Sequence, residues 1–170
     1  NIKSTAEALK AMKTEEAIAL FQKYKVFTPN ELHSRYEIYV EQYAKHINIE
    51  ARASLAMVKT LYRPAVVQYK GELAQAVISL KQADSSNEVE SRLLSRIADL
   101  LESMDGKTQV LEAAANKALQ ESDPEKRGDI CRDEVFVAQS DLRSDVDALE
   151  MLLPTRLWPV PSYADMMFNL

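Results

Sequence analysis

Apolar and polar positions alternate with a helical period along most of the chain. Between Thr28 and the polar cluster 83–87, apolar or small residues recur at positions 32, 36, 40, 43, 47, 51, 55, 58, 62, 66, 69, 73, 77 and 80. These 13 steps cover 48 residues, about 3.7 residues per step, which is close to the α-helical period and far from the period of two in a strand. The pattern predicts one very long helix. Pro64 predicts a kink or break within it, because proline lacks an N–H donor and clashes with the preceding turn.

Start and stop signals predict the remaining helices. Thr14, followed by two glutamates, predicts a short helix to about Lys23, and Thr28-Pro29-Asn30-Glu31 predicts a capping box that opens the long helix. A second long helix should begin near Asn87, with apolar positions at 89, 93, 97, 100, 104, 111, 115 and 118. A third should follow the cap Ser122-Asp123-Pro124-Glu125, carry one apolar stripe and end at Pro154. That stripe consists of Cys131, Val135, Ala138, Leu142, Val146, Leu149 and Leu153.

Long amphipathic helices joined by short polar turns must pack antiparallel to bury their stripes. The sequence therefore predicts an all-α fold, an elongated antiparallel helical bundle with long helices and an aromatic, proline-rich C-terminal tail. The tail after Pro154 is too apolar to remain in water by itself. Two interpretations stay open: the tail packs back on the bundle, or it docks on another subunit or domain. Its large side chains are Leu157, Trp158, Val160, Tyr163, Met166, Met167 and Phe168.

Composition and charge narrow the class of protein. Only 3 glycines and 6 prolines interrupt 170 residues, which suits a helical chain, and the single cysteine cannot form an internal disulfide. The net charge of −5 divides into +3 over residues 1–85 (12 basic, 9 acidic) and −8 over residues 86–170 (9 basic, 17 acidic). Nucleic-acid binding is not expected, because it needs a concentrated basic surface. No apolar run approaches the ~20 residues that span a bilayer.

A search for chemistry gives no catalytic, cofactor-binding or metal-binding candidate. The only histidines, His33 and His46, lack the Glu-x-x-His spacing of di-iron bundles, and with one cysteine they cannot form a usual zinc site. No glycine-rich phosphate loop is present. Cys131 lies on a core stripe and is expected to be a buried, inert thiol. The acidic cluster of Asp141, Asp145, Asp147 and Glu150 is expected to be a solvated helix face, and the less favoured alternative is a surface for a basic partner.

Aromatic residues are the candidates for interaction. Tyr36, Tyr39 and Tyr43 have the i, i+3, i+7 spacing of one helix face, a stripe that belongs either to the core or to an interface. The tail adds Trp158, Tyr163 and Phe168. These six residues are the predicted interaction residues.

Five segments, in order, carry a resemblance over nearly the whole chain. They are ELHSRYEIYVEQY (31–43), INIEA (47–51), PAV (64–66), LRSDVDALE (142–150) and LWPVPSYADMMF (157–168). Together they resemble the C-terminal region of type III glutamine synthetases, the large bacterial form of that enzyme. Ala164 and Arg63 depart from the family pattern, which has glycine and an apolar residue at these places.

The resemblance implies a helical C-terminal domain of a cytoplasmic enzyme that makes glutamine from glutamate, ammonia and ATP with Mg or Mn. The family's active-site motifs lie upstream, so this segment is expected to hold no active site. Its implied partners are the upstream catalytic domain of the same chain and further copies of the enzyme. On this view residues 1–27 continue from the upstream domain, 28–153 form the bundle and 154–170 form a docking tail. The alternative is a freestanding helical adaptor or sensor bundle that mediates protein–protein interaction.

Overall fold

The computed structural model describes residues 4–161 and 163–168, with the backbone alone for residues 163 and 164. Helices make up most of this part of the chain, which contains no strand, and the predicted all-α helical bundle is confirmed. The α-helices are α1 (Thr5–Leu9), α2 (Glu15–Lys23), α3 (Pro29–Met57), α4 (Arg63–Gln82), α5 (Glu88–Gln120), α6 (Pro124–Ile130), α7 (Phe136–Glu150) and α8 (Tyr163–Met167). Two π-helical segments, Val58–Tyr62 and Cys131–Val135, and two 3₁₀ segments, Lys10–Lys13 and Thr155–Leu157, lie between them.

The predicted helix starts are confirmed by their caps. The backbone N–H of Thr28 donates to Glu31 Oε2 at 2.8 Å, and the N–H of Glu31 donates back to Thr28 Oγ1 at 3.3 Å, which is the reciprocal pattern of a capping box. Asp123 Oδ1 accepts from the N–H groups of Glu125 and Lys126 at 2.8 and 3.1 Å. Thr14 caps α2 through the N–H of residue 17. Short polar side chains thus satisfy donors that each first turn leaves free.

Two helices, α2 and α4, end in the same way. Beyond α2, Lys25 has φ 53° and its N–H donates to Gln22 O, while the N–H of Val26 donates to Phe21 O. Beyond α4, Asp84 has φ 52° with the corresponding pair of bonds. This is the Schellman motif, in which a left-handed residue usually is glycine; here Lys25 and Asp84 occupy the position.

The chain is helical on both sides of Pro64, as predicted. The interruption takes the form of the π-helical segment Val58–Tyr62, in which the N–H of Arg63 donates to Val58 O, five residues back. Proline has no N–H and its ring clashes with the carbonyl four residues earlier, so the wider turn accommodates it. The second π-helical segment, Cys131–Val135, contains no proline and divides the predicted third helix into α6 and α7.

The third helix also ends earlier than predicted. Helix α7 stops at Glu150, not at Pro154, and the N–H groups of Leu152 and Leu153 both donate to Leu149 O at 3.0 Å in the turn that follows. The residue before a proline disfavours the α conformation, so the chain leaves the helix before it reaches Pro154.

The contacts divide the chain into two compact units. Unit 1 comprises Asn1–Ala53 and Val110–Gln139, and unit 2 comprises Ser54–Gln109 and Ser140–Leu170. The buried side chains of unit 1 include Leu32, Tyr36, Val40, Ala44, Ile47, Ala51, Leu111, Ala115, Ala118, Cys131 and Val135. Those of unit 2 include Val58, Val66, Leu73, Val77, Ile97, Met104, Leu142, Val146, Leu149 and Leu153. These buried residues belong to the apolar stripes predicted from the sequence. Val89, which was predicted to lie on such a stripe, is exposed.

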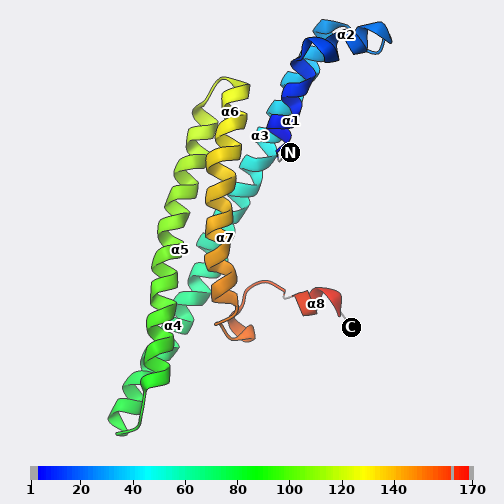
Figure 1. Ribbon diagram of the computed structural model, residues 1–170. Coiled ribbons are helices and arrows are strands. Elements are labelled where there is room, and N and C mark those ends of the chain that lie inside the picture. The colour runs from blue at the N-terminus through cyan, green and yellow to red at the C-terminus, as the bar shows by residue number, and fades with distance from the viewer. Residues whose placement is uncertain (1–3, 162, 169–170) are drawn as a thin grey trace. The chain divides into compact units, whose positions relative to one another are not determined.

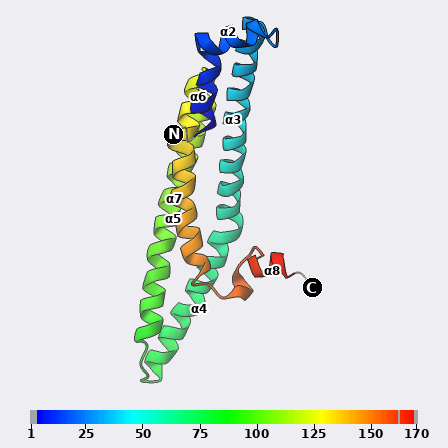
Figure 2. The same ribbon diagram turned by 45° about the vertical axis from the view of Figure 1, so that its right-hand side comes forward.

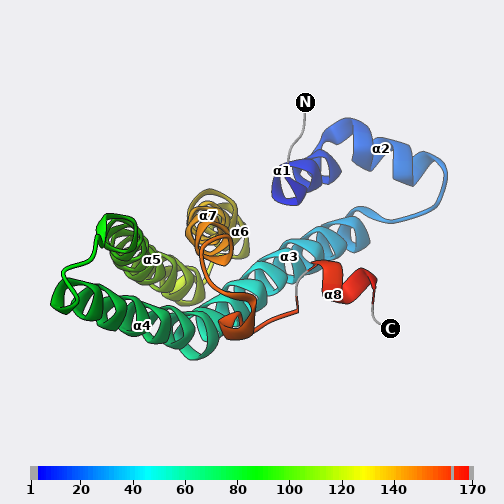
Figure 3. The same ribbon diagram turned by 90° about the horizontal axis from the view of Figure 1, so that it is seen from below.

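In unit 1, the short helices α1 and α2 lie in different directions before the chain returns to the start of α3 (Figure 3). In unit 2, a tight loop reverses the chain between α4 and α5, which run antiparallel (Figures 1 and 2). The tail leaves the end of α7 and passes through the 3₁₀ segment before α8 (Figure 2).

Candidate interaction sites

The structure separates the three tyrosines of α3. Tyr36 is only 3% exposed and belongs to the core, Tyr39 is 40% exposed, and Tyr43 is partly buried. Lys13 Nζ lies 4.9 Å from the centroid of the Tyr36 ring. Burial, followed by the negative charge of Glu125, raises the pKa of Tyr36 to about 12. Burial also raises the pKa of Tyr43. Of the stripe, Tyr39 is therefore the most accessible to a partner.

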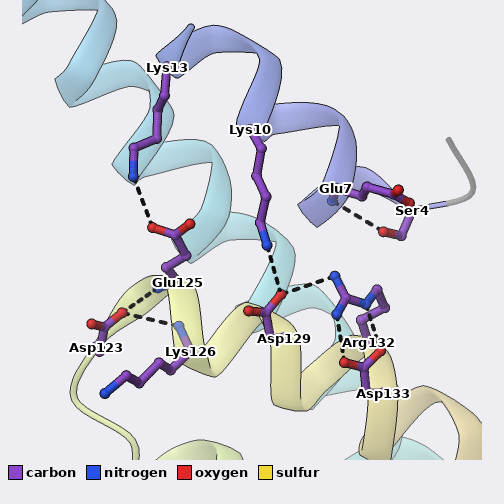
Figure 4. Close-up of polar contacts among 10 residues, drawn as sticks. All are labelled: Ser4, Glu7, Lys10, Lys13, Asp123, Glu125, Lys126, Asp129, Arg132 and Asp133. Atoms are coloured by element: carbon purple, nitrogen blue, oxygen red, sulfur yellow. Dashed lines mark hydrogen bonds and ion pairs between the residues drawn. The ribbon is translucent and has the colours of Figure 1, made fainter.

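Ion pairs join the 3₁₀ segment Lys10–Lys13 to α6, and one further pair joins α6 to the π-helical segment Cys131–Val135 (Figure 4). Lys13 Nζ lies 3.0 Å from Glu125 Oε2, and Lys10 Nζ lies 3.5 Å from Asp129 Oδ1. Arg132 Nη1 lies 3.0 Å from the same Asp129 oxygen. We call these five residues the N-terminal clamp. Its side chains are 29–46% exposed, although Asp129 Oδ1 itself is buried. Each pair therefore contributes on the order of 1 kcal/mol, and the N-terminal helices are held by weak contacts together.

Gly128 of α6 lies close to side chains of two other helices of unit 1. A Cβ added at Gly128 of α6 would lie 3.3 Å from Val40 Cγ1 of α3 and 4.0 Å from Ala6 Cβ of α1. Ala6 and Val40 are both buried. The absence of a side chain at Gly128 therefore lets Val40 of α3 approach α6 closely, whereas the distance to Ala6 is an ordinary van der Waals contact.

An open hollow of about 330 Å³ lies beside the N-terminal clamp in unit 1. Its apolar walls are Tyr43, Ile47 and Phe136. Its polar rim is formed by Ser4, Thr5, Glu7 and Arg132. The sequence analysis did not predict this hollow. Its lining residues come from α1, α3 and the start of α7, and the pattern of any one of these helices does not indicate that the three meet.

The near part of the tail is anchored within unit 2. The rings of Trp158 and Tyr62 stack with centroids 5.0 Å apart and an interplanar angle of 27°. Arg156 Nη2 donates to Glu72 Oε2 of α4 at 2.5 Å, which lowers the pKa of Glu72. Trp158 Nε1 is buried and finds no acceptor within the described part of the chain. The predicted interaction residue Trp158 thus makes an internal contact, with Tyr62 on the π-helical segment.

The far part of the tail is different. Met166, Met167 and Phe168 are 58%, 74% and 73% exposed. The predicted interaction residue Phe168 is therefore accessible, whereas the side chain of Tyr163 lies outside the described atoms. We call Met166–Phe168 the tail end; it is an apolar patch that a chain in water would be expected to cover.

The acidic cluster on α7 was predicted to be a solvated face, and this is wrong for Asp145. Asp145 is 7% exposed, and its carboxylate accepts from Ser103 Oγ at 2.6 Å and from Lys107 Nζ at 2.7 Å. The other members, Asp141, Asp147 and Glu150, are exposed as predicted. The signal was in the spacing, because Asp145 follows Leu142 by three residues and precedes Leu149 by four, which places it on the core stripe.

Two of the remaining chemical residues, Cys131 and His33, lie in different surroundings. Cys131 is buried as predicted, and burial raises the pKa of its thiol. His33 is exposed and pairs with Glu37 one turn later at 3.4 Å. Among residues 4–161 and 163–168, no three His, Cys, Asp or Glu side chains lie close enough to hold a metal ion. Over the same residues, no helix is long and apolar enough to span a membrane.

The chain is similar to glutamine synthetases in two comparisons with known proteins. Residues 1–81 match the family described as Glutamine synthetase C-terminal domain. The Type-3 glutamine synthetase of Dictyostelium discoideum is 29% identical over 174 residues, which cover 99% of this chain and 24% of the relative. Glutamine synthetase of Butyrivibrio fibrisolvens is 25% identical over 186 residues, covering 100% and 25%, and that of Bacteroides fragilis (strain YCH46) is 22% identical over 175 residues, covering 99% and 24%. The chain spans about a quarter of the length of these relatives. The predicted resemblance to glutamine synthetases is confirmed.

Proposed function

We propose that this chain, which carries the glutamine synthetase C-terminal domain, is the structural and assembly region of a type III enzyme and contains no active site. The parent enzyme would ligate ammonia to glutamate in the cytoplasm, using ATP and Mg or Mn bound by its upstream catalytic domain. The relatives are about four times as long as this chain, which leaves room for such a domain.

The observation that carries the assembly role is the division of the tail. Its near part is anchored through Trp158 and Arg156, while the large side chains of its far part remain in solvent. Single exposed apolar residues are ordinary on protein surfaces, but three consecutive large ones indicate a contact with another surface. We infer that the tail end docks on the catalytic domain of another subunit, so that the parent enzyme is a homo-oligomer.

The test of assembly uses the full-length protein. Replacing Met166, Met167 and Phe168 together by serine should shift the oligomer toward smaller species in light scattering. Met151→Ser is the matched control, because Met151 is 84% exposed but lies before the tail. The melting temperature of the isolated 170-residue chain should stay unchanged in the triple variant, because these side chains bury little surface in it. An unaltered oligomer in the triple variant would refute the docking role.

The proposal that this chain contains no active site is tested with the 170-residue chain, purified from a host that lacks its own glutamine synthetase. We expect no ATP-dependent formation of glutamine. Turnover that persists through further purification would contradict the proposal.

A further inference from the structure

Helix α3 carries two large apolar side chains on the face opposite to its core residues. Ile38 and Ile49, both in unit 1, are 50% and 65% exposed. Gln42 and Lys45 are exposed between them. The positions 38, 42, 45 and 49 advance by four, three and four residues, which is the spacing of the seam of a coiled coil. We call these four residues the outer stripe; its spacing is that of a helix face that packs against another helix.

The outer stripe has the same pattern of apolar and polar residues in both directions. An isoleucine stands at each end, and a polar residue stands at each of the two central positions. When two copies of such a helix lie antiparallel, Ile38 of one copy meets Ile49 of the other, and Gln42 meets Lys45. In a two-fold contact, residue i of one copy touches residue j of the other while j touches i, so the contact needs a self-complementary face of this kind. The pattern therefore favours a second copy of this chain over an unrelated partner.

The charge on the outer stripe selects the antiparallel arrangement. A parallel pair would place Lys45 against Lys45 of the second copy at the centre of the contact, where the like charges repel each other. In the antiparallel pair, Lys45 instead faces the neutral amide of Gln42, whose carbonyl oxygen can accept a hydrogen bond from the ammonium group. Glu41 Oε1 lies 3.0 Å from Lys45 Nζ within one copy, so the charge of this lysine is already balanced.

Tyr39 extends the contact along one edge of the stripe. It follows Ile38 by one position and is 40% exposed. His46 follows Lys45 by one position and is also exposed. Since both residues stand one position after a residue of the seam, the antiparallel register places Tyr39 of each copy beside His46 of the other. This gives the predicted interaction residue Tyr39 a partner side chain.

We propose that the outer stripe is a contact between two copies of this chain, in which two α3 helices pack antiparallel about a two-fold axis between residues 43 and 44. This inference rests on the proposed function in one respect, namely that the parent enzyme is a homo-oligomer. The stripe covers about three helical turns, so the contact is smaller than the ~1,200–2,000 Å² of a stable interface. It is therefore weak in the isolated chain. In the parent enzyme it acts together with the tail end, because copies that are already held together have a high effective concentration.

The first experiment cross-links two variants of the 170-residue chain, Ile38→Cys and Ile49→Cys. Both positions are exposed, so neither replacement removes a core side chain, and the natural Cys131 stays buried. In an antiparallel pair of the two variants the added thiols face each other. In a pair of identical variants they lie about 16 Å apart along the helix, which is beyond the reach of a disulfide. A mixture of Ile38→Cys with Val26→Cys is the matched control, because Val26 is 53% exposed in unit 1 but does not belong to α3.

We expect the equimolar mixture of Ile38→Cys and Ile49→Cys to form disulfide-linked dimers at least ~10-fold faster than either variant alone or the control mixture under copper–phenanthroline, since only this mixture brings two added thiols together. Peptide mapping by mass spectrometry identifies the disulfide between positions 38 and 49. Equal rates in all samples would show random collision and would overturn the proposal. Faster cross-linking of each variant with itself would show parallel helices and would overturn it as well.

A second measurement tests the polar centre of the outer stripe. Gln42→Glu places a carboxylate opposite Lys45 of the second copy, whereas Gln42→Lys places an ammonium group there. In sedimentation equilibrium at low ionic strength, we expect the association constant of the dimer to rise roughly 2- to 10-fold in Gln42→Glu and to fall by a similar factor in Gln42→Lys, because two exposed charge pairs form in each dimer. Gln42 is exposed, so both variants should keep the melting temperature of the unaltered chain. Equal association of the two variants would contradict the antiparallel contact.

The tail end is unchanged in all of these variants, and the catalytic domain on which it is proposed to dock lies upstream of this chain. Failure of the cross-linking would therefore leave assembly through the tail end intact. Conversely, the serine variant of the tail end can fail to alter the oligomer without any effect on the contact of α3. The two proposals are thus refuted by different results.

Discussion

The stack of Trp158 on Tyr62 is the contact that we expect to keep the tail on its unit. Removing a fully buried tryptophan costs about 3–5 kcal/mol, and Trp158 is only partly buried, so we expect Trp158→Ala to lower the free energy of unfolding by about 2 kcal/mol. About 0.5–1.5 kcal/mol of that belongs to the ring pair itself. In a chain of this size, each kcal/mol of lost stability lowers the melting temperature by about 2–4 °C, so we expect Trp158→Ala to lower it by about 4–8 °C.

Circular dichroism melts of Trp158→Leu, Tyr62→Leu and the double variant give the coupling energy of the pair. Trp158 is the only tryptophan, so its fluorescence reports on this contact alone. Tyr62→Leu should shift the emission to longer wavelength as the indole gains solvent. Tyr24→Leu is the control, because that tyrosine is 66% exposed in unit 1. Purely additive energies together with an unchanged emission in Tyr62→Leu would refute the anchoring role.

Three further predictions concern single side chains. Asp145→Ala should lower the free energy of unfolding by about 1.5–3 kcal/mol in urea titrations, because it removes the charged acceptor of the hydrogen bonds from Ser103 and Lys107. Lys25→Gly should raise the free energy of unfolding by about 0.5 kcal/mol with an unchanged m value, because glycine adopts the left-handed backbone without strain. The contact with Lys13 lowers the pKa of Glu125, so this pair stabilises above pH 4.5 and is lost as pH falls through the lowered pKa. Glu125→Gln should therefore flatten the decline of stability with acid in urea titrations at successive pH values.

Much of the helical framework could be predicted because its causes are local. The capping box of Thr28 and Glu31 and the cap at Asp123 join residues two or three positions apart. The period of about 3.7 places one stripe on one helix face whatever surrounds it. Leu32, Val66 and Leu142 are accordingly buried.

The candidate sites were predicted less completely. The sequence indicated that aromatic residues of α3 and of the tail would be interaction sites, but it could not assign them. Tyr36 lies in a core, Trp158 stacks on Tyr62, and Phe168 remains exposed, although all three have the same apolar character. Which apolar residue is covered depends on what lies opposite, and the period of one helix does not contain that information.

The amino-acid sequence by itself determined the helix starts, the two faces of each helix and the resemblance to glutamine synthetases. Tertiary structure alone decided the contacts between distant residues, such as Lys13 with Glu125, 112 positions apart, and Ser103 with Asp145, 42 positions apart. It also decided that Asp145, on a stripe of apolar residues, would be buried with two donors. Caps and periodicity act within one turn of helix, whereas a polar group is buried only where packing brings partners that satisfy it.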